Sequence, residues 1–254
     1  MKKVRKLFIL LLIPSGFLHS NNINDYIQKG DQYYNNYNNI SALNSYLNAY
    51  KIAPDNYNVL LRLARTYNDL GEEFYEYRME DSSEAMIKNA IEFSKRMEKD
   101  FPDSATSYAY LAMSYGNQAL YEGSKAKIML ANKIESDAKK SLQINPNQYL
   151  SYVILGIYYR QIADLSWFER MFANTFFGNV PEGTFNQSVE MFRKALAIKP
   201  KTIVASFQLA LTYKAMGDEE KEKNLLEELI NYPQENFRDK FAIKKAKKRL
   251  MELE

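Results

Sequence analysis

The chain has 254 residues, of which 46% are hydrophobic and 26% are charged, and this composition indicates a folded globular protein with a substantial core. It contains no cysteine, and its one histidine, His19, lies near the N-terminus. Beyond residue 20 this excludes disulfides, Cys/His zinc sites and catalysis by a histidine base or a cysteine nucleophile. Nine glycines are too few for the many tight turns of an all-β protein.

Residues 1–20 have the pattern of a signal peptide. Basic residues (Lys2, Lys3, Arg5 and Lys6) precede an apolar run from Leu7 to Leu18, which is shorter than the roughly 20 residues of a membrane span. We therefore predict an exported chain, periplasmic or secreted. The alternative is an uncleaved anchor, through which the N-terminus would associate with a membrane. Without these residues the net charge falls from +3 to −1, which leaves no global electrostatic basis for nucleic-acid binding.

The remainder of the chain repeats one helical pattern, in which two large residues are followed by a small one and then by an aromatic one. The small residue lets neighbouring helices approach closely, and the aromatic ring fills the space one turn further on. The small and aromatic positions are Gly30/Tyr33, Ala64/Tyr67, Ala112/Tyr115, Gly156/Tyr159 and Ala210/Tyr213. Prolines at 54, 102, 146, 200 and 233 follow in phase, where a second helix has to stop.

These spacings predict five helix pairs over residues 23–56, 57–103, 104–147, 148–201 and 202–235, which together make a repeat domain at 21–236. The middle three pairs are longer than the first and the fifth. The extra segments of the second and third pairs contain no proline and one glycine between them, so we expect helix pairs lengthened by whole turns rather than by loops.

In this register the chain resembles the tetratricopeptide repeat (TPR) family, which pairs the same first-helix pattern with a proline after the second helix. The segment from Leu165 to Pro200 further resembles the regulator of microtubule dynamics family. Both resemblances imply an all-α, TPR-like solenoid. For some eukaryotic members the second implies roles at microtubules or membrane contact sites and a phospholipid-accommodating repeat domain. Those members carry anchors and motifs that were not found in this sequence, so the microtubule role is not carried over.

In a TPR array the first helix of each pair lines a concave groove, and this places one set of side chains near that face. Its polar and apolar members suit a peptide backbone with its carboxylate, or an acidic headgroup beside acyl chains. The alternative is a solvated inner face whose cations are paired to nearby acids. The predicted groove residues are Arg65, Asn68, Met113, Asn117, Ile157, Arg160, Gln161, Trp167, Leu211 and Lys214.

The only tryptophan, Trp167, lies in the largest insertion and shares a helical face with Arg160, so it has two interpretations: groove contact or core packing. After it, Gly178 is a predicted left-handed C-cap, and Thr184 with Gln187 predicts a capping box.

Residues 237–254 form a basic amphipathic segment with seven Lys/Arg. Its main interpretation is the helix that closes the last hydrophobic face of a solenoid, and its alternative is binding to a membrane surface or an acidic partner.

The leading functional prediction is a non-enzymatic adaptor that binds a protein segment in its groove, without cofactor or metal. The alternative from the same groove is a carrier of phospholipid or another small apolar ligand. A third hypothesis, a carboxylate enzyme built on Glu72, Glu73, Glu76 and Glu80, is weaker because these residues have the spacing of a solvated helix face.

Overall fold

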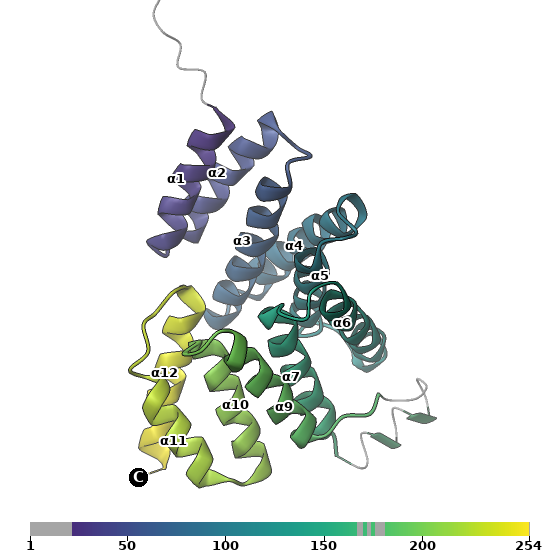
Figure 1. The fold of residues 1–254 in the computed structure, drawn as a ribbon, viewed down its shortest axis with the longest axis vertical. Coiled ribbons are helices and arrows are strands. Elements are labelled where there is room, and N and C mark those ends of the chain that lie inside the picture. Colours follow the sequence, from purple (N-terminus) through teal and green to yellow (C-terminus); the bar gives the residue numbers. More distant parts are fainter. Residues whose placement is uncertain (1–21, 167–169, 172–173, 176–180, 254) are drawn as a thin grey trace, which may run out of the picture.

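The computed structural model describes residues 22–166, 170–171, 174–175 and 181–253, and these residues form helices and no strand (Figure 1). The helices are α1 (Ile23–Asn35), α2 (Asn39–Ile52), α3 (Tyr57–Glu76), α4 (Glu80–Asp100), α5 (Ala105–Gln118), α6 (Ser124–Ile144), α7 (Tyr149–Ala163), α9 (Phe185–Ile198), α10 (Ile203–Met216), α11 (Glu219–Leu229) and α12 (Phe237–Glu252).

Each helix packs on the next, so the chain forms antiparallel pairs that stack along a curved path (Figure 1). The first helices of successive pairs also touch each other: α3 contacts α5, α5 contacts α7, and α7 contacts α10. They form the inner layer, and α4, α6, α9 and α11 form the outer layer. The expected all-α solenoid is confirmed, and the added length of the second and third pairs lies in α3, α4 and α6. The fourth pair differs from the prediction, because α7 and α9 have only 15 and 14 residues and the added residues lie between them.

Close packing within a pair depends on the small residue of the repeated pattern. A Cβ added to Gly156 of α7 would lie 2.7 Å from ring atoms of Phe192 on α9, whose side chain is fully buried. In the first pair, a Cβ on Gly30 would overlap the ring of the fully buried Tyr46. The small residue therefore makes room for an aromatic ring of the partner helix.

Side-chain caps fix where several helices begin. The predicted capping box of α9 is confirmed, since the hydroxyl of Thr184 accepts from the backbone N–H of Gln187 while the Gln187 side chain accepts from the backbone N–H of Thr184. Asparagine side chains also cap the starts of α1, α2, α3 and α12. The predicted C-cap at Gly178 lies outside the described residues.

The predicted role of residues 237–254 as a capping helix is confirmed by the packing of α12. Ala242, Ile243 and Ala246 share a buried cluster with Leu226 and Leu229 of α11 and with Phe207 of α10. The other side of α12 contacts α3, which lies far away in the sequence (Figure 1). The C-terminal helix therefore closes the inner layer onto the second helix pair.

In the part of the chain that the structure describes, no helix has the length and hydrophobicity that crossing a bilayer requires. The predicted signal peptide at 1–20 lies outside that part.

Candidate partner-binding channel

The inner layer carries a buried polar cluster where α3 meets α5. Asn68, which is fully buried, donates to the carbonyl of Ala64 and to the hydroxyl of Ser114, both at 2.9 Å. The Asn117 amide donates to Asn68 Oδ1 and to Glu72 Oε1, both at 3.0 Å. Two of the predicted groove residues, Asn68 and Asn117, are thus in direct contact, and their hydrogen bonds join two neighbouring repeats.

We call the concave side of α3, α5, α7 and α10 the inner channel. Arg65 of α3 already has partners on α1 and α2. Its guanidinium lies 3.7 Å from the centre of the Tyr34 ring, 3.4 Å from the Tyr46 hydroxyl and 4.0 Å from an oxygen of Asp31. Burial raises the pKa of Asp31, but hydrogen bonds from Arg62 and Tyr46 outweigh burial and hold that pKa below its ordinary value. At this point the alternative interpretation, cations paired with nearby acids, describes the structure well.

Arg238, from the first turn of α12, reaches side chains of both α3 and α5. Its Nη2 atom lies 2.7 Å from Asp69 Oδ1, and its Nε atom lies 2.8 Å from Glu72 Oε2. The sulfur of Met113, a predicted groove residue on α5, is 3.5 Å from Nη2. Tyr34 completes the arrangement by donating its hydroxyl proton to Asp69 Oδ2 at 2.8 Å. Arg238 therefore joins α12 to α3 and α5.

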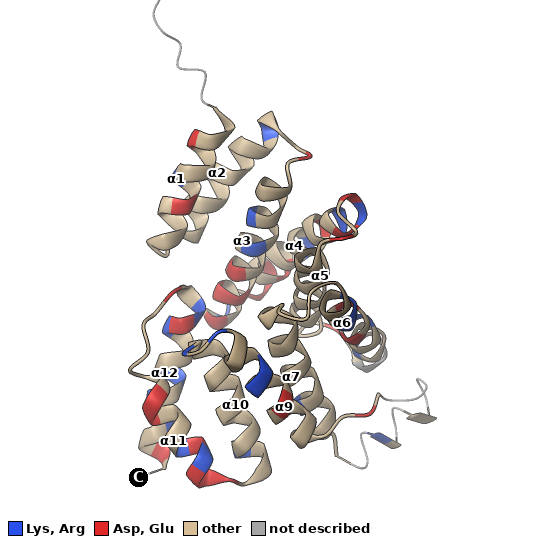
Figure 2. Cartoon of the chain, viewed as in Figure 1, with Lys and Arg blue, Asp and Glu red and all other residues tan. Residues whose placement is uncertain are grey.

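The acidic residues of α3 are not the solvated face that their spacing suggested. Glu72 and Glu76 have side chains only 31% and 26% exposed, and they pair with Arg238 and Lys245 of α12. Glu73 accepts a hydrogen bond from the Asn39 amide at 3.1 Å. Burial raises the pKa of Glu72 above its ordinary value, against the opposing effect of Arg238. Figure 2 shows this acidic half of α3 where it approaches α12.

On the far side of the channel, the apolar groove residues Ile157 and Leu211 pack partly into the hydrophobic clusters of the last repeats. Arg160 of α7 donates to the Gln208 side chain of α10, while its Nε atom is buried without a hydrogen-bond partner. Burial lowers the pKa of Arg160, and the negative charge of Asp164 opposes this shift. Arg160 is therefore a half-buried cation on the inner layer.

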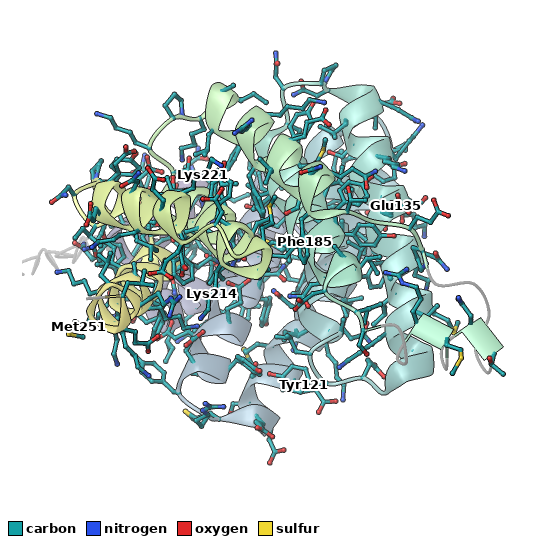
Figure 3. The ribbon with its side chains drawn as sticks, turned by 90° about the horizontal axis from the view of Figure 1, so that it is seen from below. Tyr121, Glu135, Phe185, Lys214, Lys221 and Met251 are labelled. Atoms are coloured by element: carbon teal, nitrogen blue, oxygen red, sulfur yellow. The ribbon has the colours of Figure 1, made fainter. Side chains whose placement is uncertain are left out.

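The other predicted groove residues are less informative. Gln161 and Lys214 are both exposed, and Lys214 lies near the C-terminal end of α10 (Figure 3). Trp167 lies outside the described residues, so its orientation stays a prediction. Within the same insertion, Arg170 donates to the carbonyl of Ile162 at 2.7 Å and ties this segment back to α7.

Arg238 was not among the predicted groove residues, whereas Tyr34 and Asp69 occupy first-helix positions that the repeat pattern places near the concave face. The predictions took the concave face from first-helix positions alone, and Arg238 comes from a helix expected only to cap the solenoid. One signal was available in the sequence: four acids on one face of an inner helix need countercharges, and residues 237–254 are the most basic segment after the N-terminus.

Little space remains beside Arg238. A cavity of about 60 Å³ lies between α7, α10 and the start of α12, and its walls include Val153, Ala205 and Arg238. This volume would hold about two water molecules. The start of α12 therefore fills the channel at this level.

Comparison with known proteins identifies the family to which this helical architecture is related. The family model for regulator of microtubule dynamics protein 1-3 matches residues 26–254. Regulator of microtubule dynamics protein 1 of Mus musculus is 27% identical over 142 residues, which is 56% of this chain and 46% of the relative. Regulator of microtubule dynamics protein 2 of Mus musculus is 25% identical over 195 residues, or 76% of this chain and 47% of the relative. The chain spans about half the length of the curated relatives it matches.

Solved structures agree on the fold. A thermophilic TPR protein of Thermus thermophilus superposes with a TM-score of 0.66 at 18% identity, covering 89% of this chain and 98% of its own. The pilF protein of Pseudomonas aeruginosa has a TM-score of 0.52 at 14% identity, covering 91% of each chain. At these identities the likeness shows a TPR-type fold alone.

The predicted export from the cell is wrong. The matching relatives are mammalian regulators of microtubule dynamics, which are not exported proteins. The prediction relied on the composition of residues 1–20 alone. The family match covers residues 26–254 and therefore depends on many more positions of the sequence.

Proposed function

The chain belongs to the regulator of microtubule dynamics family, and from this premise we propose that it is a non-enzymatic adaptor that binds a segment of a partner protein in its inner channel. The TPR-type fold and the named relatives support an interaction protein. The use of the inner channel, and the absence of catalysis, are part of the proposal.

One observation carries the proposal: the inner layer already holds a helical segment, namely the start of α12. Arg238 is bound between carboxylates of α3, and Phe237 and Phe241 pack edge-on against Tyr77 with ring centres 6.5 and 5.7 Å apart. A helix lying in a groove, held by charged and aromatic anchors, is a common mode of peptide recognition.

The inner layer also offers polar groups to a partner beyond α12. The half-buried Arg160 carries a guanidinium, a group suited to a carboxylate, and the exposed ammonium of Lys214 adds a second positive charge. The carrier alternative has less support, because the 60 Å³ cavity beside Arg238 is too small for an acyl chain.

The test is a selection of binding peptides from a displayed library against the full chain, followed by fluorescence anisotropy with each selected peptide. Arg160→Ala should weaken binding by about tenfold or more if the inner layer is used, equivalent to about 1.4 kcal/mol. Arg193→Ala, an exposed arginine on the outer helix α9, is the matched control and should leave the affinity unchanged. Equal effects of the two variants, or the lack of any selected peptide, would contradict the proposal.

Tubulin should be included among the probes, because the relatives are named for microtubule dynamics. Co-sedimentation of the full chain with assembled microtubules, repeated with the Arg160→Ala and Arg193→Ala variants, would show whether tubulin is the partner.

A further inference from the structure

The acidic face of α3 depends on α12 for its countercharges. Asp69, Glu72, Glu73 and Glu76 recur at steps of three and four and therefore share one face of the helix. We call Asp69, Glu72, Glu73 and Glu76 the acidic wall. Among the described residues, the only Lys or Arg atoms within ion-pair distance of three of these acids, Asp69, Glu72 and Glu76, belong to Arg238 and Lys245. Without α12, the wall would place like charges side by side in a partly buried setting.

The helix that neutralises the wall is itself two-sided. One side is anchored by apolar packing on α10 and α11 and by the ion pair of Arg249 with the buried Glu222, at 2.7 Å. The other side, which carries Phe237, Arg238, Phe241 and Lys245, faces α3. The contact with the wall is made of charges and aromatic edges, whereas the contact with the last repeat is made of buried aliphatic groups.

These two kinds of contact differ in how readily they can be exchanged. Ion pairs lose much of their attraction to the cost of removing both charges from water, so the net free energy of the wall contact is small compared with its number of close pairs. A second helix that carried the same charges would form the same pairs with the wall. The Tyr77 ring, which meets both phenylalanines, is 52% exposed and can be reached by another chain.

We propose that the acidic wall is the recognition surface for a cationic, aromatic-bearing helical segment of a partner protein, and that the start of α12 occupies this surface until the partner displaces it. This inference rests on the proposed adaptor function and names the chemistry of its partner.

The contacts of α12 define what such a segment needs. The Arg238 guanidinium lies within ion-pair distance of two carboxylates on successive turns of α3, although its Nε atom makes no hydrogen bond. A planar group with several nitrogens reaches both carboxylates more readily than the single ammonium of lysine. The aromatic residue one turn later meets Tyr77, and a basic residue seven positions after the arginine meets Glu76. The expected partner helix therefore carries arginine, an aromatic residue three positions later and a basic residue seven positions later.

The test uses the full chain and a fluorescent peptide of residues 234–250 as the probe. A matched peptide replaces the residues equivalent to Arg238 and Lys245 by glutamine and keeps every apolar residue. Since the chain has no cysteine, Glu76→Cys and Lys245→Cys can be introduced and bridged with a bismaleimide, which holds α12 on the wall. Arg238→Gln is the complementary variant, in which α12 is weakly held. Circular dichroism confirms that each form is folded.

We expect the probe to bind the Arg238→Gln chain about tenfold or more tightly than the wild type, because the competing helix is weakened. The bridged chain should lose binding relative to the same chain before bridging, and the glutamine peptide should not bind either form. Asp69→Asn with Glu72→Gln should abolish binding of the probe.

Equal binding to the bridged and unbridged chains would overturn the inference, and this comparison does not require Arg238 to be removed. Failure of the probe to bind any folded form would overturn it as well. If peptides selected in the adaptor test bind the bridged chain with unchanged affinity, the wall is not their site, and the adaptor function stands without this inference. If no selected peptide binds at all, the adaptor function itself fails.

Discussion

Two helix contacts of this protein differ in the side chains that form them: one is apolar and the other is ion-paired. Between α7 and α9, Gly156 lies directly against the buried ring of Phe192, and the contact is apolar and close. Between α3 and α12, side chains from residues far apart in the sequence meet through Arg238 and two carboxylates. The first type of contact is also made in the first pair, between Gly30 and Tyr46, whereas the second occurs where the solenoid closes on itself.

This difference indicates which contact contributes mainly to stability and which contributes mainly to the choice of binding partner. Apolar packing beside a small residue is strongly stabilising and leaves little freedom to change partners. An ion-paired contact contributes less net free energy but selects its partner by charge. We therefore assign stability mainly to the repeated contacts and specificity mainly to the closing contact.

Removing the Phe192 ring should produce the largest loss of stability. Phe192→Ala leaves a cavity against Gly156, and we expect the free energy of unfolding to fall by about 3–5 kcal/mol. Chemical denaturation monitored by circular dichroism measures it. Phe192→Leu, which keeps most of the volume, should cost clearly less; an equal loss for both variants would mean that the cavity is not the cause.

Adding a methyl group on the other side of the same contact should have the next largest effect. Gly156→Ala places a Cβ against the Phe192 ring, and overpacking of this kind costs about 1–3 kcal/mol. Combining Gly156→Ala with Phe192→Leu should recover part of the loss, because the smaller side chain makes room. Strict additivity of the two changes would show that the residues do not pack against each other.

The closing contact should be weaker than the repeated ones. Arg238→Gln leaves Asp69 and Glu72 without a countercharge, and since the Arg238 side chain is 22% exposed, we expect a loss of about 1–3 kcal/mol rather than the value of a fully buried pair. The matched change Arg193→Gln on the outer layer should alter stability by less than about 0.5 kcal/mol. A loss for Arg238→Gln as large as that for Phe192→Ala would remove the distinction drawn between the two contacts.

Asp137 and Glu98 are two neighbouring acids without an arginine between them, and they can be compared with the arginine-bridged pair Asp69 and Glu72 through the pH dependence of stability. Burial, and then the neighbouring Glu98, raise the pKa of Asp137 from its ordinary 3.8 to about 6. Between these two values the folded chain keeps a proton that the unfolded chain has lost, so stability falls as the pH rises and levels off above pH 6.

Asp137→Asn should flatten this slope and stabilise the chain at pH 7 by roughly 1 kcal/mol, a value reduced for partial exposure to solvent. Denaturation midpoints of both proteins at several pH values between 4 and 7 measure the effect. Parallel pH profiles for the two proteins would contradict it.

The sequence predicted the repeated contacts well, since their signals are local. Gly156, Tyr159 and the phased prolines mark one helix pair, and Thr184 with Gln187 marks the start of α9. Asn68 and Asn117 were assigned to the inner layer from their repeat positions, and they are in contact there.

The closing contact could not be predicted in the same way. Whether Arg238 reaches Asp69 depends on the curvature of the whole solenoid. That curvature results from the unequal helix lengths of several repeats together, and a local sequence pattern does not determine it. The basic residues of the last helix were visible in the sequence, but their partners on α3 were not.

The central claim is that α12 closes the inner channel by binding α3, and the spin–spin distance between these helices tests it most directly. Nitroxide labels at Glu80→Cys, just beyond α3, and Lys244→Cys on α12 occupy exposed positions in a chain without other cysteines. We predict strong dipolar broadening in the wild-type background and a loss of broadening when Arg238→Gln is added. A spectrum without broadening in the wild-type background would contradict the closed channel.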